Sequence, residues 1–227
     1  MRSMGQEVQG VFEKVVYRSL LACGLLLAGC ASTSQMYSSQ IITDPSSTLL
    51  KPGELTSFGI AFITPSTVTG QEEDKQALAL AFSKTLEEQR PNTRVVPLTE
   101  TLTSVNRAGL FENYKRMIIE YRDSGLLDPI ALAQVGQAAD VRYVAVLNMA
   151  TFQQVYHDRL GVFGLRLLQT KEANIRLTLQ IWNSSDGSVA WEGAQELHMA
   201  DETAAEDAVS FGMVVQAAAE KLVAKIP

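Results

Sequence analysis

One segment near the C-terminus constrains the fold more than any other, because apolar and polar residues alternate along it. Residues 175–182 (IRLTLQIW) place an apolar side chain at every second position, a pattern typical of a strand with one face buried. Residues 184–187 (SSDG) end in a glycine that can adopt a positive φ, which predicts a turn. Residues 188–198 (SVAWEGAQELH) predict the returning strand, with Trp191 near Trp182. We therefore expect an antiparallel hairpin.

Three other runs predict strands nearer the N-terminus. Residues 58–63 (FGIAFI) form a short apolar run stopped by Pro65, as expected for a buried strand. Residues 94–98 (RVVPL) predict a second strand, and Pro97 favours a sheet edge or a strand end. Residues 141–149 (VRYVAVLNM) are mostly apolar and rich in β-branched side chains. This last run predicts a central strand that is covered on both faces.

Helices are predicted between these strands. The acidic residues 72–74 suit the positive end of a helix dipole. Apolar residues then follow at a spacing of four on one face, at Leu78, Phe82 and Leu86. Pro91 ends this helix.

Two further helical stretches follow before the central strand. Residues 102–122 have a mostly helical pattern, and Gly125 closes it. Asp128 before Pro129 is a strong start signal, because Asp caps a helix and Pro fits its first position.

The final helix is predicted to open with Thr203 and Glu206, which have the spacing of a capping box. Its apolar stripe should cover the sheet and comprises Ala208, Phe211, Val215, Ala218, Leu222 and Ile226. The order of elements predicts the α/β class. We expect a mixed β-sheet of about four to five strands with helices on its faces, in which the C-terminal β-hairpin is followed by a long helix.

The N-terminal region has the pattern of a lipoprotein signal peptide. Residues 27–30 (LAGC) match a bacterial lipobox, with small residues beside the cut. The apolar run before it, residues 20–28, follows the basic residues Arg2, Lys14 and Arg18. This run is about half as long as the roughly 20 residues of a membrane-spanning helix. We expect residues 1–29 to be removed and Cys30 to be lipidated.

The rest of the chain is expected to consist of a tether and a single domain. Residues 30–55 should form the lipidated cysteine and a flexible tether, because residues 32–47 hold many Ser, Thr and Gln. Residues 56–227 should form one α/β domain. Ala31 and Ser32 stand where similar lipoproteins retained in the inner membrane commonly have Asp. We therefore expect an outer-membrane protein that is anchored to the membrane through acylated Cys30.

Composition and motifs exclude several functional classes. The two cysteines, Cys23 and Cys30, both precede the expected domain, which rules out a disulfide or a cysteine nucleophile there. The formal net charge of -6 and the lack of a basic cluster longer than residues 115–116 argue against nucleic acid. His157 and His198 lie too far apart in sequence to match a metal-ligand pair. We expect no metal, no cofactor and no enzymatic activity.

The connection between the central strand and the C-terminal hairpin is unusually apolar. Residues 151–172 span this connection, and connections of such length are often functional. Two interpretations are open: these residues extend the flanking strands and cover the core, or they form an exposed patch that binds a protein partner or the membrane surface. The candidate partner-binding residues are Val162, Phe163, Leu165, Leu167 and Leu168.

Residues 56–226 resemble the family of the curli secretion lipoprotein CsgG and the penicillin-binding-protein activator LpoB. The likeness lies in residues 58–65 (FGIAFITP), in 131–149 (ALAQVGQAADVRYVAVLNM) and in the hairpin 177–193 (LTLQIWNSSDGSVAWEG). The resemblance implies a periplasm-facing outer-membrane lipoprotein domain that works without catalysis.

Two functions follow from this resemblance. The first is an adaptor or assembly factor that contacts an envelope protein or associates with itself. The alternative is a subunit of an oligomeric secretion channel similar to CsgG. Residues 151–172 lie where the first membrane hairpin of such a channel would be, but Asp158, Arg159 and Lys171 leave little room for lipid-facing strands.

Overall fold

The computed structural model describes residues 33–43, 48–162, 165–203 and 210–227, with the backbone alone at 33–37, 156–162, 165–171 and 201–203. Within it, residues Ser34–Pro227 form one compact unit. The expected leader and Cys30 lie outside the described residues.

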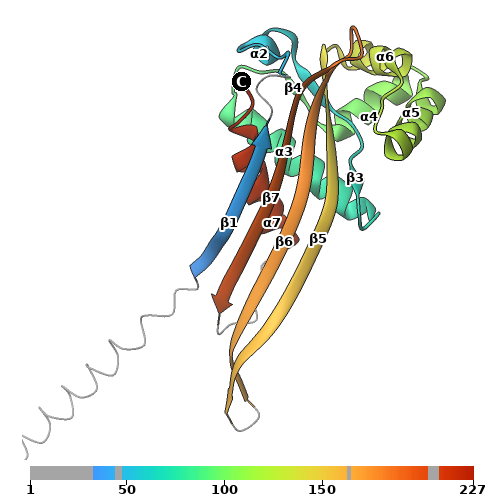
Figure 1. Ribbon diagram of the computed structural model, residues 1–227. Coiled ribbons are helices and arrows are strands. Elements are labelled where there is room, and N and C mark those ends of the chain that lie inside the picture. The colour runs from blue at the N-terminus through green and yellow to red at the C-terminus, as the bar shows by residue number, and fades with distance from the viewer. Residues whose placement is uncertain (1–32, 44–47, 163–164, 204–209) are drawn as a thin grey trace, which may run out of the picture. The chain divides into compact units, whose positions relative to one another are not determined.

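A seven-stranded mixed sheet runs through this unit (Figure 1). Its strands are β1 (Thr33–Thr43), β2 (Ile60–Phe62), β3 (Ser66–Thr67), β4 (Val95–Val96), β5 (Tyr143–Val162), β6 (Leu165–Asn183) and β7 (Val189–Thr203). The order is β1-β7-β6-β5-β2-β4, and β3 pairs with β5 outside this path. Strand β2 is parallel to β4 and β5, whereas β6 is antiparallel to β5 and β7. The predicted α/β class is confirmed, with more strands than expected.

Helices cover both faces of the sheet. They are α2 (Glu54–Phe58), α3 (Glu72–Gln89), α4 (Leu98–Arg107), α5 (Phe111–Ser124), α6 (Pro129–Ala139) and α7 (Phe211–Val223). In Figure 1, α3 and α7 lie behind the long strands, and α4, α5 and α6 gather at one end of the unit.

The alternating residues of β6 form the centre of the first core. Their apolar side chains are almost completely buried, at Ile175, Leu177, Leu179 and Ile181. They belong to one cluster with the apolar stripes of α3 and α7, so the predicted inward face of this strand is confirmed. Each such buried side chain contributes roughly 1.5–3 kcal/mol through removal from water.

The second core lies on the other face, under α5 and α6. Met117 and Leu132 pack there with Val144, Val146 and other buried residues of the sheet, including Trp182. Both faces of β5 are therefore covered in its first half, as predicted for a central strand.

The two tryptophans do not meet as expected. Trp191 pairs with Ile181, and a register shift follows before Trp182 pairs with Val189. Trp191 therefore belongs to the first core and Trp182 to the second. The prediction that they lie together is wrong, because adjacent positions of a strand point to opposite faces.

The strand predicted at residues 58–63 is shorter than expected and comprises only Ile60–Phe62. Phe58 is the last residue of α2. Gly59 follows it with a φ of 70° and a ψ of 168°, so the helix cannot continue. The N–H of Gly59 donates to the carbonyl of Leu55 at 2.8 Å, which closes the helix. The strand begins only at Ile60, so the prediction for Phe58 is wrong.

The other helix boundaries follow their local chemistry. Helix α3 begins at Glu72, and α5 ends at Gly125, whose φ is 74°. The Oδ1 of Asp128 accepts a hydrogen bond from the N–H of Ala131 at 2.7 Å, with Pro129 as the first residue of α6. These predicted signals are confirmed.

The final helix begins later than predicted. Thr203 still belongs to β7, and Glu206 and Ala208 lie outside the described residues. The cap of α7 is instead Ser210, whose Oγ accepts a hydrogen bond from the N–H of Met213 at 3.2 Å. The stripe from Val215 onward is buried as expected.

The expected tether and the apolar connection also contain strands. Residues 32–47 were expected to be a flexible linker, but β1 occupies most of that range and lies beside β7 at the sheet edge. Pairing with a neighbouring strand satisfies backbone groups that a Ser- and Thr-rich linker would leave to water. Residues 151–162 and 165–172 extend β5 and β6, as the first of the two interpretations expected for the backbone.

Tyr121 links α5 to the sheet and makes stability depend on pH. Its hydroxyl donates to Oε1 of Gln180 at 2.9 Å. Burial, and then the negative charge of Glu192, raise the pKa of Tyr121 to about 12. An unfolded Tyr has a pKa near 10, so this contribution to stability is fully present below about pH 10 and is lost as the pH rises toward 12.

We therefore expect the free energy of unfolding to fall less in Tyr121→Phe than in the native protein between about pH 8 and pH 11.5. Denaturant titrations followed by tryptophan fluorescence at both pH values measure this difference. An identical fall in both proteins would contradict the assignment.

Candidate functional site

On the second face of the sheet, the described helices α5 and α6 cover one end. Helices α5 and α6 pack over the end near the β6–β7 turn, where the buried side chain of Trp182 lies. Farther along the same face, β5, β6 and β7 carry polar side chains in register with one another. We call this region the open face, and it comprises Gln153, Val155, Glu172, Asn174, Arg176, Glu196, His198 and Ala200.

A charged trio lies in the open face. Nη2 of Arg176 donates to Oε2 of Glu196 at 3.0 Å, and Nε2 of His198 lies 3.3 Å from Oε1 of the same carboxylate. The hydrogen bond from Arg176, followed by the charges of Arg176 and His198, lowers the pKa of Glu196. The lowered pKa favours the ionised carboxylate, which links Arg176 of β6 to β7 and lies beside His198 on its own strand. Because all three side chains are partly exposed, this trio adds little to stability.

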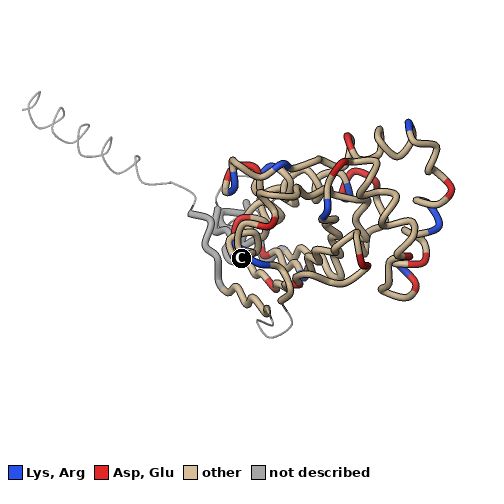
Figure 2. The backbone as a smooth tube through the Cα atoms, turned by 90° about the horizontal axis from the view of Figure 1, so that it is seen from above, with Lys and Arg blue, Asp and Glu red and all other residues tan. Residues whose placement is uncertain are grey.

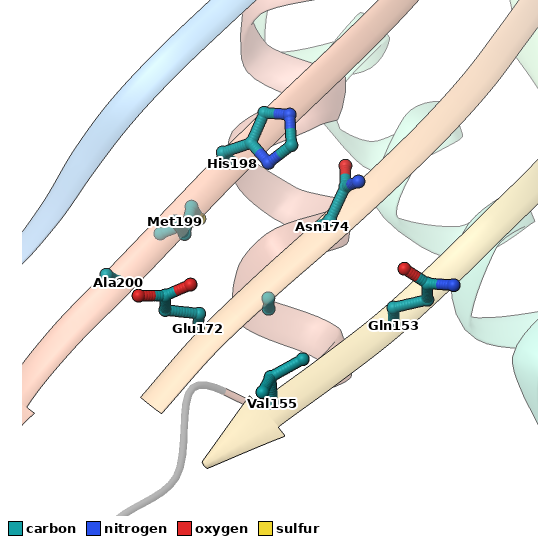
Figure 3. Close-up of a pocket in the computed structure, with 8 residues that line it drawn as sticks. Gln153, Val155, Glu172, Asn174, His198, Met199 and Ala200 are labelled. Carbon is teal, nitrogen blue, oxygen red and sulfur yellow. The ribbon is translucent and has the colours of Figure 1, made fainter. Parts of the chain in front are cut away.

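A hollow of about 360 Å³ lies beside this trio. Figure 3 shows Gln153, Asn174 and His198 pointing outward from three adjacent strands around it. Val155, 45% exposed, adds an apolar contact surface. The Oδ1 of Asn174 is buried and has no hydrogen-bond partner among the described residues. Asn174 thus brings an unused acceptor to the wall of the hollow, and a bound N–H or O–H group would reach it once the amide turns outward.

The two histidines are not brought together, and the described residues form no metal-binding cluster. His157 is in register with Thr170 and His198 with Asn174, so β6 separates the two histidines and they lie at different heights of the sheet. No group of three or more His, Cys, Asp or Glu side chains in the described part could hold a metal ion. In the same part, no helix has the length and apolar character needed to cross a membrane.

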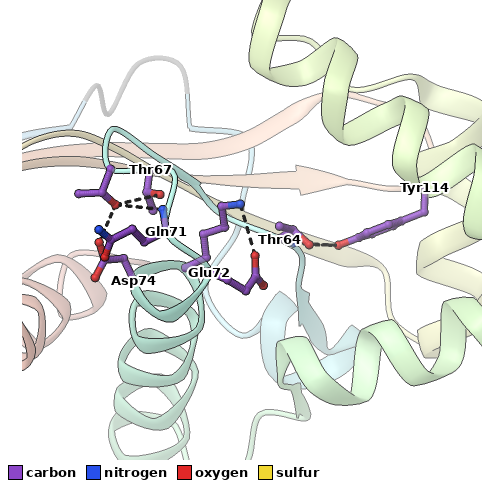
Figure 4. Close-up of polar contacts among 8 residues, drawn as sticks. Thr64, Thr67, Gln71, Glu72, Asp74 and Tyr114 are labelled. Atoms are coloured by element: carbon purple, nitrogen blue, oxygen red, sulfur yellow. Dashed lines mark hydrogen bonds and ion pairs between the residues drawn. The ribbon is translucent and has the colours of Figure 1, made fainter.

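Glu72 and Asp74, at the start of α3, contact neighbouring side chains (Figure 4). Oγ1 of Thr69 donates to Oδ2 of Asp74 at 2.5 Å, and Nζ of Lys75 donates to Oε2 of Glu72 at 3.4 Å. Nearby, the hydroxyl of Tyr114 accepts a hydrogen bond from the N–H of Thr64 at 2.9 Å. These contacts fix the helix start and leave the acidic residues as a solvated surface.

A second hollow, of about 640 Å³, lies where β2 and β5 begin. Its arginines are already engaged: Nη1 of Arg94 donates to Oδ2 of Asp140 at 2.7 Å, and the guanidinium of Arg142 lies 4.9 Å from the ring centre of Phe58. We therefore regard this hollow as structural, and the open face as the candidate site.

The residues predicted from the sequence are not those of the open face. Val162, Leu165, Leu167 and Leu168 lie on the paired backbone of β5 and β6, but their side chains are not described, and Phe163 lies outside the described residues. The open face escaped prediction because polar residues at alternate strand positions also indicate an ordinary solvated surface. Figure 2 shows Lys and Arg positions interspersed with Asp and Glu positions along the described backbone.

Comparison with solved structures finds similar chains at low sequence identity. No protein-family model and no curated protein matches the chain. A PelC dodecamer from Paraburkholderia phytofirmans is 12% identical over 83% of this chain and 94% of its own, with a TM-score of 0.44. The lipoprotein GNA1162 from Neisseria meningitidis is 10% identical over 73% of this chain and 98% of its own, with a TM-score of 0.37. Likeness at this level assigns no function.

Proposed function

We propose that this protein is a lipoprotein of the bacterial outer membrane, anchored through acylated Cys30 and facing the periplasm. It acts without catalysis, as an adaptor or assembly factor that binds an envelope protein. The lipobox at residues 27–30 supports the anchor, and the open face supports the binding role.

The observation that carries the binding role is the unused acceptor of Asn174. A buried acceptor without a donor costs roughly 1–3 kcal/mol, and here it lies at the edge of a hollow on a rigid sheet. A partner that donates a hydrogen bond would remove that cost. Val155 supplies apolar contact in the same place, while Arg176 and Glu196 supply charged positions around it.

Site-specific cross-linking in living cells tests this role. We expect a photoreactive residue at Gln153 or His198 to form one adduct with an envelope protein, and one at Lys84, which is exposed on α3, to form none. Arg176→Glu should remove the adduct, because it reverses the charge beside Glu196, whereas Lys84→Glu should leave it intact. Equal yields at all three positions would show that the open face is not a binding site.

The same experiment separates the alternative function. A subunit of an oligomeric secretion channel predicts a ladder of self-adducts at these positions and a large ring in detergent extracts. An adaptor predicts a single foreign adduct and a small detergent-extracted species.

A further inference from the structure

The lipid anchor restricts which end of the sheet can face the membrane. Strand β1 begins at Thr33, three residues after Cys30. Three extended residues span at most about 11 Å. If Cys30 is acylated, the start of β1 therefore lies within about 11 Å of the lipid attachment.

Hydrogen bonds identify that end of the sheet. Nε2 of Gln195 donates to Oγ of Ser39 at 3.3 Å, and the N–H groups of Leu49 and Leu50 both reach the carbonyl of Ala190 at 2.9 Å. Residue numbers therefore rise along β1 as they fall along β7. The start of β1 lies toward the end of β7, as Figure 1 also shows.

The β5–β6 hairpin projects beyond β7 at this same end. The last residue of β7, Thr203, pairs with Gln169 of β6. Beyond that pair, residues 165–168 of β6 pair with β5 alone among the described strands, up to the pair of Val162 with Leu165. Four strand residues extend about 13 Å. We call residues 159–162 and 165–168 the overhang.

The composition of the overhang suits a phospholipid surface. Five of its eight positions are apolar, namely Leu160, Val162, Leu165, Leu167 and Leu168. Two of the others, Arg159 and Arg166, are cationic, which favours phosphate groups at the bilayer surface. A length of about 13 Å is too short for the hydrocarbon core of about 30 Å, but it is sufficient to enter the headgroup region of one leaflet.

We propose that the overhang dips into the leaflet that holds the acylated Cys30 and fixes the orientation of the sheet on the membrane. The chain then has two attachments to one lipid surface, the acylated cysteine and the hairpin, so the long strands stand away from the bilayer. The open face, on one side of the standing sheet, is then accessible from the periplasm. This inference rests on the proposed lipidation of Cys30.

Depth-dependent fluorescence quenching tests the inference on the full lipidated protein. The thiol of mature Cys30 is consumed by lipid, so Val162→Cys provides the one free thiol for an environment-sensitive dye. The labelled protein is placed in vesicles of phosphatidylethanolamine and phosphatidylglycerol that carry a headgroup-level nitroxide quencher. Lys84→Cys on α3 is the matched control, and unchanged thermal melts show that both variants are folded.

We expect the dye at residue 162 to lose most of its emission to the quencher and to shift to the blue, and the dye at residue 84 to keep its emission. Equal, weak quenching at both positions in vesicle-bound protein would overturn the membrane contact while leaving the anchor intact. Protein that does not remain bound to the vesicles would instead contradict the lipidation of Cys30, and the proposal with it.

Discussion

Cys30→Ala is expected to abolish outer-membrane attachment of this protein. Each buried methylene of an acyl chain contributes about 0.8 kcal/mol, and two or more chains hold a protein firmly where one holds it marginally. Without the thiol no thioether can form, so the variant should keep residues 1–29 and be absent from the outer-membrane fraction. Membrane fractionation with immunodetection measures both effects.

Cys23→Ala provides the matched control for this prediction. Cys23 lies within the expected leader, and its loss should leave processing and attachment unchanged. A second variant, in which residues 1–30 are replaced by an ordinary cleavable secretory signal, should be released as soluble periplasmic protein. Cys30→Ala protein found in the outer membrane at the native level would contradict the anchor.

Gly59→Ala is expected to be the most destabilising single-methyl addition among the described glycines of positive φ. Its φ of 70° and ψ of 168° lie in a region open essentially to glycine alone. An added Cβ would also lie 2.9 Å from Cγ1 of Val141 and 3.1 Å from the carbonyl oxygen of Arg94. That oxygen accepts the N–H of Ile60 at 2.9 Å where β2 meets β4. Strain and overpacking together should cost about 2–5 kcal/mol.

Gly53→Ala measures the cost of a positive φ in the left-handed helical region without side-chain crowding. Gly53 also has a positive φ, of 83°, but a Cβ there would meet nothing within 4 Å. Its replacement should cost only about 1–2 kcal/mol. Denaturant unfolding of the detergent-solubilised protein compares the two variants. If both lose the same free energy, crowding at the junction of α2 and β2 is not the cause.

The fold could be predicted wherever a local pattern and the tertiary packing agree. Residues 175–182 alternate because one face meets the stripes of α3 and α7. Asp128 and Pro129 start α6 through a cap that depends on neighbouring backbone alone. In both places a few adjacent residues determine the local structure, so the strand and the helix start could be predicted from the sequence.

Two of the misjudged features depend on partners that are distant in the chain, and the third depends on a local hydrogen bond. Strand β1 forms because β7 lies beside it, and nothing within its Ser- and Thr-rich sequence indicates this. Trp182 and Trp191 lie on opposite faces because Trp191 pairs with Ile181, and Trp182, the next residue of β6, points the other way. Gly59 ends a helix instead of starting a strand because Leu55 lies one turn before it and accepts its N–H.

The candidate site was less predictable than the fold. The open face begins where α5 and α6 no longer cover the sheet. The sequence of β5, β6 and β7 does not indicate how far along the strands these helices extend. Asn174 is one polar position among several in an alternating strand. Only its burial without a donor separates it from the others.

The intact mass of the N-terminal peptide, isolated from the native membrane-extracted protein, tests the central claim most directly. The account predicts a peptide that begins at Cys30 and carries a diacylglycerol on its sulfur, usually with a third acyl chain on its amino group. A peptide that retains residues of the leader, with the sulfur of Cys30 unmodified, would contradict it.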